Sequence, residues 1–466
     1  MKVIFVNPPF VKNSQSNASN NFTIAPSFID KLRTPSTYRN IKGGGGRLYN
    51  YITRFFPSFY NGTRYGVRAG SRWPFSANEP MGYAPYPFFM GYAAAYLQSF
   101  GYEVNILDAI AEEVYDYQDF LAEVKRENAD IVVLECSTPT IDIDTWFATQ
   151  VATFAPVALC GPHLNDKTIA EIQASYPSIS YYLKGEYILS SLKMVKDFES
   201  GIKSGIYESE VVKDLDSIPF PFRDYKSATK YYDPSMPTPR PQLQIYASKG
   251  CPFKCTFCSW PQNMYFGNVA QRSPEKIAQE IKEAIAKHGF KSIFFDDDTF
   301  NIGEERISKL CDYLKGIGLP WTMMGRLDCS SRELYDKMVE SGCVGMRFGI
   351  ETFNQDVLKR IHKGIERKDF RYTLEYISSK YPDIFIHLTM MRDMPGQTEE
   401  MHQIDMQILK NMGYTPDGEK RNFQLSRCVP FPGTKMYEEF KQNNAGIIDQ
   451  YDKYDGGADT IVKELK

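Results

Sequence analysis

The chain has 466 residues, of which 42% are apolar and 24% are charged, and a formal net charge of −3. This length predicts two or three domains, the composition is typical of a soluble globular protein, and the mildly acidic balance without a reading-helix motif argues against nucleic acid as a partner. The longest near-apolar run, 86–97, is too short to cross a bilayer, and two prolines after Asn7 interrupt any signal-peptide region. We therefore expect a cytoplasmic protein whose nine cysteines are reduced thiols.

The first part of the chain, residues 1–195, alternates short apolar runs with segments of helical length. This pattern predicts an α/β domain with a parallel, doubly wound sheet of the Rossmann-like type. Its ligand is expected at the C-terminal ends of the strands. The expected strands are residues 2–7, 103–108, 130–135, 156–161 and 179–185.

A basic, aromatic insertion interrupts this domain at about 11–80. Residues 11–90 contain ten Lys and Arg but only two acidic residues, Asp30 and Glu79. One interpretation is an irregular insertion whose arginines are solvated or paired with acids elsewhere. The other is an arm that grips an anionic substrate or rests on an anionic membrane surface, because basic side chains with aromatic ones suit both.

A linker rich in Pro, Tyr and charged residues follows at 196–240. A second, more regular series of strands and helices occupies 241–440, before a C-terminal tail at 441–466. Six such units predict a partial (β/α)6 barrel of the TIM type, in which the residues after each strand share one mouth. The expected strands are 242–248, 292–295, 321–325, 344–350, 384–391 and 422–427.

Polar and charged residues follow the strands of this second series. Each group has a structural interpretation, since acidic residues cap helices and Pro-Gly marks turns. Together, at successive strand ends of one barrel, they predict a binding site. In chain order they are three cysteines in 251–258, the run Asp296–Phe300, Arg326 with Asp328, Glu351, the loop 394–400 and the loop 429–434.

Cys251, Cys255 and Cys258 lie within eight positions on one loop. Thiolates bind zinc and iron–sulfur clusters, and a structural zinc ion needs four ligands. Three thiolates can hold three irons of a four-iron cluster and leave the fourth iron open as a binding site. Another cysteine could still approach in space as a fourth ligand. The cysteines whose apolar surroundings are typical of core thiols are Cys160, Cys311 and Cys343.

The stretch CPFKCTFC, 251–258, resembles the CxxxCxxC signature of the radical S-adenosylmethionine enzymes. The resemblance implies a four-iron, four-sulfur cluster held by the three cysteines, with S-adenosylmethionine on the open iron. It also implies cleavage of this cofactor to a 5′-deoxyadenosyl radical. The implied contacts to S-adenosylmethionine are Phe257 beside the last cysteine, Asp297 and Asp298 at the methionine amine, Arg326 and Glu351 at the carboxylate and ribose, and Pro395 and Gly396 near the adenine.

The N-terminal half is similar to the cobalamin-binding domain of the class B radical methylases, in the stretches NPPF, LCGPHLND and LKGEY and in the linker stretch LDSIPFPF. The DxHxxG motif that supplies a histidine to cobalt in some cobalamin proteins is absent, which suggests cobalamin without a histidine ligand. His163 has the alternative interpretation of a polar loop residue. The implied cobalamin contacts are Pro9, Ser137, Thr138, Gly161, Pro162, His163, Gly185 and Glu186.

These resemblances imply methylation of an unactivated carbon. One S-adenosylmethionine would methylate cobalt, and a second would supply the radical that abstracts a substrate hydrogen before methyl transfer. Two alternatives stay open. The first is a radical enzyme of the same architecture that performs rearrangement, cyclisation or oxidation, since CSWPQ at 258–262 resembles radical enzymes of hopanoid biosynthesis. The second is a non-enzymatic iron–sulfur or zinc-binding protein.

The same resemblances and the basic insertion indicate the expected partners. The substrate is a small molecule or is lipid-like, and the basic insertion would suit an anionic one. A reducing protein such as a flavodoxin or ferredoxin would supply electrons. If the insertion rests on a membrane, the cytoplasmic protein is also membrane-associated through a peripheral contact.

Overall fold

The computed structural model describes residues 1–13, 63–67, 75–77, 82–236, 238–444 and 446–455. These residues form two compact units. Within these ranges, none of the helices combines the length and the hydropathy that a membrane-spanning segment requires. The first unit contains Met1–Glu210, Pro221–Lys230 and the described part of Asp449–Thr460, and the second contains Val211–Phe220 and Tyr231–Ile448.

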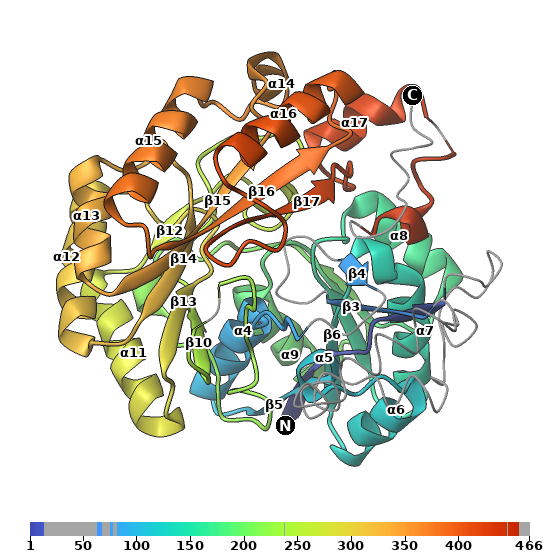
Figure 1. Ribbon diagram of the computed structural model, residues 1–466. Helices are drawn as coiled ribbons and strands as arrows, with labels where there is room; N and C mark the ends of the chain where they lie inside the picture. Colours follow the sequence, from blue (N-terminus) through green and yellow to red (C-terminus); the bar gives the residue numbers. More distant parts are fainter. Residues whose placement is uncertain (14–62, 68–74, 78–81, 237, 445, 456–466) are drawn as a thin grey trace, which may run out of the picture. The chain divides into compact units, whose positions relative to one another are not determined.

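The first unit is built on a six-stranded parallel sheet, drawn in blue to green in Figure 1. The expected doubly wound architecture is confirmed, with one strand more than the five expected. The strand order is β5 (Glu103–Asp108), β1 (Lys2–Asn7), β6 (Ile131–Glu135), β7 (Val157–Cys160), β8 (Tyr181–Leu183) and β9 (Gly205–Tyr207). The order reverses between β1 and β6, which is the switch point where open parallel sheets bind ligands.

Helices cover both faces of this sheet, which explains why its strands are nearly continuous apolar runs. On one face, α4 (Phe88–Ser99) packs against α9 (Ile188–Glu199). On the other, α6 (Tyr117–Arg126) packs against α7 (Ile141–Val151). Side chains from α6 and α7 form one core with alternate residues of β1, β6 and β7, because successive side chains of a strand point to opposite faces.

Three short strands of the 11–80 insertion are described, and they form an antiparallel sheet. They are β2 (Val11–Asn13), β3 (Thr63–Val67) and β4 (Phe75–Ala77). Most of the basic and aromatic residues that suggested a substrate-gripping or membrane-binding arm lie outside the described residues.

The second unit is a parallel sheet whose six strands follow chain order, drawn in green to red in Figure 1. The expected partial (β/α)6 barrel is confirmed. Its strands are β10 (Gln242–Ile245), β13 (Ser292–Phe295), β14 (Trp321–Gly325), β15 (Cys343–Glu351), β16 (Phe385–Arg392) and β17 (Arg421–Arg427). The connecting helices are α11 (Pro274–His288), α12 (Glu304–Ile317), α13 (Arg332–Glu340), α15 (Arg367–Lys380) and α16 (Glu399–Asn411).

Alternate residues of the barrel strands face the helices and the interior. In β15, Met346, Phe348 and Ile350 join the core beneath the helices. Arg347 and Gly349 have the opposite parity and therefore face the interior. The register of β15 shifts between Gly349 and Glu351, and the Glu351 carboxylate lies on the Gly349 side, 2.8 Å from where a Gly349 Cβ would stand. The polar residues that end these strands thus lie at the mouth of one barrel, as predicted from their positions after the strands.

The C-terminal segment folds back onto the first unit. Lys167 of that unit forms an ion pair with Asp449, at 2.7 Å between Nζ and Oδ1. The short helix η4 (Tyr451–Lys453) brings the Tyr451 ring to 4.8 Å from the His163 ring, measured between centroids. Residues 449–455 are therefore a structural part of the first unit, whereas the sequence predicted only a tail from residue 441.

Candidate active site

The loop with three cysteines begins directly after β10. Its base is a two-residue strand, β11 (Ser248–Lys249), that pairs antiparallel with β12 (Ala270–Gln271). Gly250 adopts a positive φ of 81°, and a Cβ there would lie 2.1 Å from the Asn268 carbonyl oxygen, so only glycine fits. The three cysteines that follow are all partly exposed, whereas five of the other six are buried.

Two aspartates after β13 fix the start of this loop. The Asp297 carboxylate accepts hydrogen bonds from the Ala247 amide at 3.0 Å and the Ser248 hydroxyl at 2.6 Å. Asp298 accepts one from the Gly250 amide at 2.9 Å. Burial raises the pKa of Asp297 to about 7, although the bonds from Ser248 and Ala247 oppose the increase. Both Asp297 oxygens are engaged by the loop, so the geometry gives it a positioning role, and its contact with a methionine amine stays a prediction.

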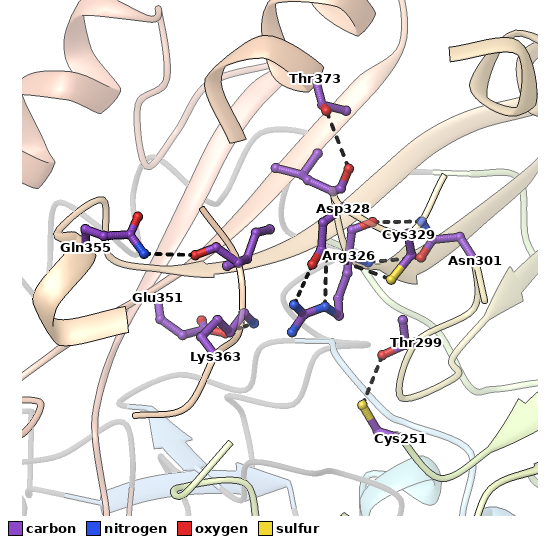
Figure 2. Close-up of polar contacts among 12 residues, drawn as sticks. Cys251, Thr299, Asn301, Arg326, Asp328, Cys329, Glu351, Gln355, Lys363 and Thr373 are labelled. Carbon is purple, nitrogen blue, oxygen red and sulfur yellow. Dashed lines mark hydrogen bonds and ion pairs between the residues drawn. The ribbon is translucent and has the colours of Figure 1, made fainter. Parts of the chain in front are cut away.

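Arg326 lies beside the cysteine loop, as Figure 2 shows. Its guanidinium is 3.6 Å from the centroid of the Phe253 ring, which lies between the first two cysteines. It also forms two hydrogen bonds with Asp328, from Nε at 2.9 Å and Nη2 at 2.8 Å. Asn301 holds the Arg326 backbone, accepting from its amide at 3.0 Å and donating to its carbonyl at 2.7 Å. Phe253 and Asn301 were not assigned from the sequence.

Glu351 ends β15 on the interior face, with a positive φ of 63°. Its carboxylate forms a buried ion pair with Lys363 at 2.6 Å. Burial raises the pKa of the Cys255 thiol, and the positive charges of Lys363 and then Arg326 oppose this increase. The charges of Arg326 and Glu351 therefore both act on the Cys255 thiol. Lys363 also acts on it, and this residue was not assigned from the sequence.

The remaining predicted contacts to S-adenosylmethionine lie on two loops of the same unit. Phe257 is buried within the cysteine loop. Pro395 and Gly396 follow β16, where Gly396 adopts a positive φ of 79° and packs against Arg360. All three residues lie on loops that follow barrel strands, as the sequence predicted. Their contacts with S-adenosylmethionine stay predictions.

The donor set of the cysteine loop suits an iron–sulfur cluster. Among the described residues, no three His, Cys, Asp or Glu side chains already meet in the way that a single metal ion requires. A four-iron cluster is larger than an ion and can bind one thiolate on each of three irons, so three partly exposed thiols on one loop fit it better than they fit zinc. The Cys251 thiol lies 3.4 Å from the Thr299 hydroxyl, which itself donates to the Asp298 carbonyl at 2.7 Å.

In the first unit, loops after β6 and β7 bring several predicted cobalamin contacts together. His163 Nδ1 lies 3.1 Å from the Thr138 hydroxyl, and the Ser137 hydroxyl lies 2.7 Å from that of Thr140. Gly161 has a φ of 112°, and a Cβ there would lie 2.4 Å from the Cys136 carbonyl oxygen. Pro162 lies between Gly161 and His163.

The other predicted cobalamin contacts follow β1 and β8 at the same edge of the sheet. Pro9 is buried after β1. Gly185 has a φ of 56°, and the fully buried Glu186 accepts a hydrogen bond from Ser209 through its carbonyl, at 3.0 Å. His163 is also buried, and desolvation followed by the charge of Lys167 lowers its pKa to about 3.

The second unit thus combines a partial barrel with three cysteines on the loop after its first strand, and comparison with known proteins shows what this unit is similar to. Residues 245–407 match the model of the Radical SAM superfamily, so the barrel of the second unit is a radical SAM domain and the resemblance of CPFKCTFC is confirmed. This match of the barrel supports a four-iron, four-sulfur cluster and S-adenosylmethionine as cofactors. Cys251, Cys255 and Cys258 are the predicted cluster ligands.

Two curated relatives match most of the chain. One, from Pyrococcus horikoshii and described as an uncharacterized methyltransferase, is 24% identical over 393 residues, 79% of this chain and 81% of its own. The other is the cytidylyl-2-hydroxyethylphosphonate methyltransferase of Streptomyces wedmorensis, 26% identical over 76% of this chain and 77% of its own.

A solved structure shares the fold of both units. The radical S-adenosylmethionine methyltransferase TsrM from Kitasatospora setae, with tryptophan substrate and a cofactor analogue bound, superposes with a TM-score of 0.62 at 16% identity. The match covers 77% of this chain and 74% of TsrM. TsrM with cobalamin and a four-iron, four-sulfur cluster bound superposes with a TM-score of 0.60.

Proposed function

We propose that this protein is a cobalamin-dependent radical S-adenosylmethionine methyltransferase that methylates an unactivated carbon of a small molecule. The observation that carries the proposal is the combination, in one chain, of a doubly wound sheet with its switch point between β1 and β6 and a radical SAM barrel. The same combination occurs in TsrM, which binds cobalamin and the cluster. Two relatives that match most of this chain are named methyltransferases.

The residues of the second unit bind and orient the cofactors of the radical step. Cys251, Cys255 and Cys258 hold the cluster, while Asp297 fixes the base of their loop. Arg326, held against Phe253 and Asp328, presents a cation to the carboxylate of S-adenosylmethionine. When bound, the cluster and S-adenosylmethionine supply the 5′-deoxyadenosyl radical, and cobalamin supplies the methyl group.

The loops at the C-terminal edge of the first sheet would hold the corrin. Gly161 lets the loop after β7 pack closely on the Cys136 backbone, and the positive φ of Gly185 turns the loop after β8, so both glycines shape this edge of the sheet. His163 is buried and bonded to Thr138, which favours cobalamin bound without a histidine ligand to cobalt. The pre-formed edge would position the corrin and exclude water from it.

The barrel interior indicates the chemistry of the substrate. Arg347, His387 and Gln424 lie on the interior face of neighbouring strands, since His387 is the register partner of Arg347 and Gln424 has the same parity in β17. A wall of this kind suits a small molecule with hydrogen-bonding groups better than a hydrocarbon. A flavodoxin or ferredoxin would be the reducing partner. A contact between the basic insertion and an anionic substrate or membrane belongs to the same proposal.

Anaerobic reconstitution with iron, sulfide and hydroxocobalamin tests this function. We expect about four irons and one cobalt per chain after desalting, and both 5′-deoxyadenosine and S-adenosylhomocysteine from S-adenosylmethionine under reductant. Iron and deoxyadenosine without retained cobalt would overturn methyl transfer and favour rearrangement, cyclisation or oxidation. The Cys255→Ala variant should lose both products, whereas Cys311→Ala, a buried thiol of the barrel core, should retain them.

A further inference from the structure

Lys363 is tied to the cysteine loop although more than a hundred positions separate them. It follows α14 (Gln355–Arg360), and its amide donates to the Leu358 carbonyl at 3.0 Å. Two residues earlier, the Ile361 carbonyl accepts from the Thr256 amide at 3.0 Å. This bond joins the turn that carries Lys363 to the residue after Cys255. The fold therefore fixes the lysine and the cysteine loop against each other.

The ammonium of Lys363 is buried, and its ion-pair partner among the described residues is Glu351. The side chains of Lys363 and Glu351 are only 7% and 8% exposed, and their ion pair is 2.6 Å long. Gly349 provides the space, because a Cβ there would lie 2.8 Å from Glu351 Oε1 and 3.1 Å from Lys363 Nζ. A buried pair of this kind is a poor source of stability, because desolvation of the two charges offsets their attraction. Its position therefore calls for a functional explanation.

The charges around Cys255 supply that explanation. The turn that carries Lys363 is hydrogen-bonded to the residue after Cys255, and the Arg326 guanidinium lies over the Phe253 ring between Cys251 and Cys255. Glu351 is the anion beside the lysine. Arg326 is also neutralised by Asp328, at 2.8 Å. A cluster bound here would bring three thiolates to this site, and its one-electron reduction would add a further negative charge. In a poorly solvated site, a fixed ammonium nearby stabilises the reduced state.

We propose that Lys363 is a positioning residue of the cluster site whose ammonium charge raises the reduction potential of the cluster, with Glu351 setting how much of that charge the cluster experiences. The inference rests on the cluster of the proposed function. One electron passes from a low-potential one-electron donor to the cluster. No covalent bond of the protein forms or breaks, and the lysine acts through its charge alone.

An anaerobic redox titration of the reconstituted cluster, followed by electron paramagnetic resonance without S-adenosylmethionine or cobalamin, tests the proposal. Lys363→Met should make the cluster harder to reduce by about tenfold in the equilibrium constant, which is 59 mV for one electron. Lys363→Arg, which keeps the charge, should stay near the wild-type potential. Glu351→Gln should shift the potential in the opposite direction, because the ammonium then loses its counter-ion.

The matched control is Lys337→Met. Lys337 pairs with Asp312 at 2.9 Å on the outer helices α12 and α13, so the variant removes one charge without touching the barrel mouth, and its potential should not change. Equal potentials in Lys363→Met and wild type, at equal iron content, would overturn the proposal. So would shifts of the same sign in Lys363→Met and Glu351→Gln, which a general loss of structure produces. If the wild type holds no cluster, the proposed function fails as well, whereas a held cluster with unchanged potentials defeats this inference alone.

Discussion

The Arg326 guanidinium lies 3.6 Å from the centroid of the Phe253 ring, so a strand-end cation is stacked on the loop that carries the cysteines. This contact fixes the plane of the guanidinium, and Asp328 accepts hydrogen bonds from its Nε and Nη2 atoms. An arginine held in this way is pre-organised for a planar carboxylate. Phe253 therefore links the cluster loop to the predicted contact with S-adenosylmethionine.

Phe253→Ala should weaken binding of S-adenosylmethionine. A cation–π contact contributes about 0.5–2 kcal/mol, so the dissociation constant should rise roughly 2- to 30-fold. Equilibrium dialysis with labelled cofactor measures it, after iron analysis shows equal cluster content. Tyr372→Ala is the control, because Tyr372 makes a similar contact with Arg332, at 3.9 Å, but is 60% exposed. Equal weakening in both variants would contradict the role of Phe253.

Cys329→Ala should retain the full cluster. Cys329 follows Asp328 near the barrel mouth and is the partly exposed cysteine outside the loop. Its sulfur lies 3.8 Å from the Asp328 carboxylate, and burial together with that negative charge raises the pKa of the thiol to about 12, which disfavours a thiolate ligand. Iron and sulfide per chain should match the wild type. Loss of one iron on this substitution would mean a fourth cysteine ligand and would support an electron carrier.

Much of the fold and part of the site could be predicted because they depend on local pattern. Cys251, Cys255 and Cys258 lie within eight positions of the sequence. The strand-end aspartates and Glu351 come at the ends of apolar runs that are visible in the sequence. Lys363 could not be assigned from the sequence, because two tertiary features place it. Gly349 leaves the space that the Lys363–Glu351 pair occupies, and the turn before Lys363 accepts a hydrogen bond from Thr256. One signal was present, since Lys363 lies in a short turn between Ile361 and Ile365.

The C-terminal segment shows the same limit over a longer distance. Lys167 and Asp449 are 282 positions apart in the sequence, and no periodicity in either segment predicts their ion pair. The sequence predicted a C-terminal tail at 441–466 and could not place this contact, because tertiary packing, and not local propensity, decides where a short terminal segment lies. Phe253 was not assigned for a similar reason. In the sequence, a Phe between two cysteines is typical of loop packing, and only the structure shows its contact with Arg326.

Asp297→Asn should change how stability depends on pH. Because burial raises the pKa of Asp297 to about 7, the folded chain keeps a proton that the unfolded chain releases near its ordinary value of 3.8. The contribution of Asp297 is therefore fully present below about pH 4 and is lost, at about 1.4 kcal/mol per pH unit, as the pH rises to about 7. The asparagine does not titrate, although it places an amide group against backbone donors and costs roughly 1–3 kcal/mol at every pH.

Thermal unfolding between pH 5 and pH 8 measures this difference. The wild type should lose its advantage over Asp297→Asn as the pH rises, and most of the change should occur below about pH 7. Parallel pH profiles for the two proteins would show that the carboxylate stays ionised in the folded state, stabilised by its bonds to Ala247 and Ser248.

His163→Ala should destabilise the first unit without changing the ligands of cobalt. The ring is 1% exposed, hydrogen-bonded to Thr138 and packed edge-on against Tyr451. Its pKa of about 3, set by burial and then by Lys167, leaves it neutral at pH 7. Removal of the hydrogen bond and the ring contact should cost roughly 1–3 kcal/mol and lower the unfolding temperature, and Tyr451→Ala should do the same.

The cobalt test uses electron paramagnetic resonance of the reduced cob(II)alamin form of the reconstituted protein. If the buried ring stays with Thr138, the wild-type spectrum should contain no splitting from a histidine nitrogen, and His163→Ala should give the same spectrum. A nitrogen splitting that disappears in His163→Ala would mean that the ring leaves Thr138 and Tyr451 to bind cobalt. Residues 449–455 would then have to move when cobalamin binds, because Tyr451 packs against that ring.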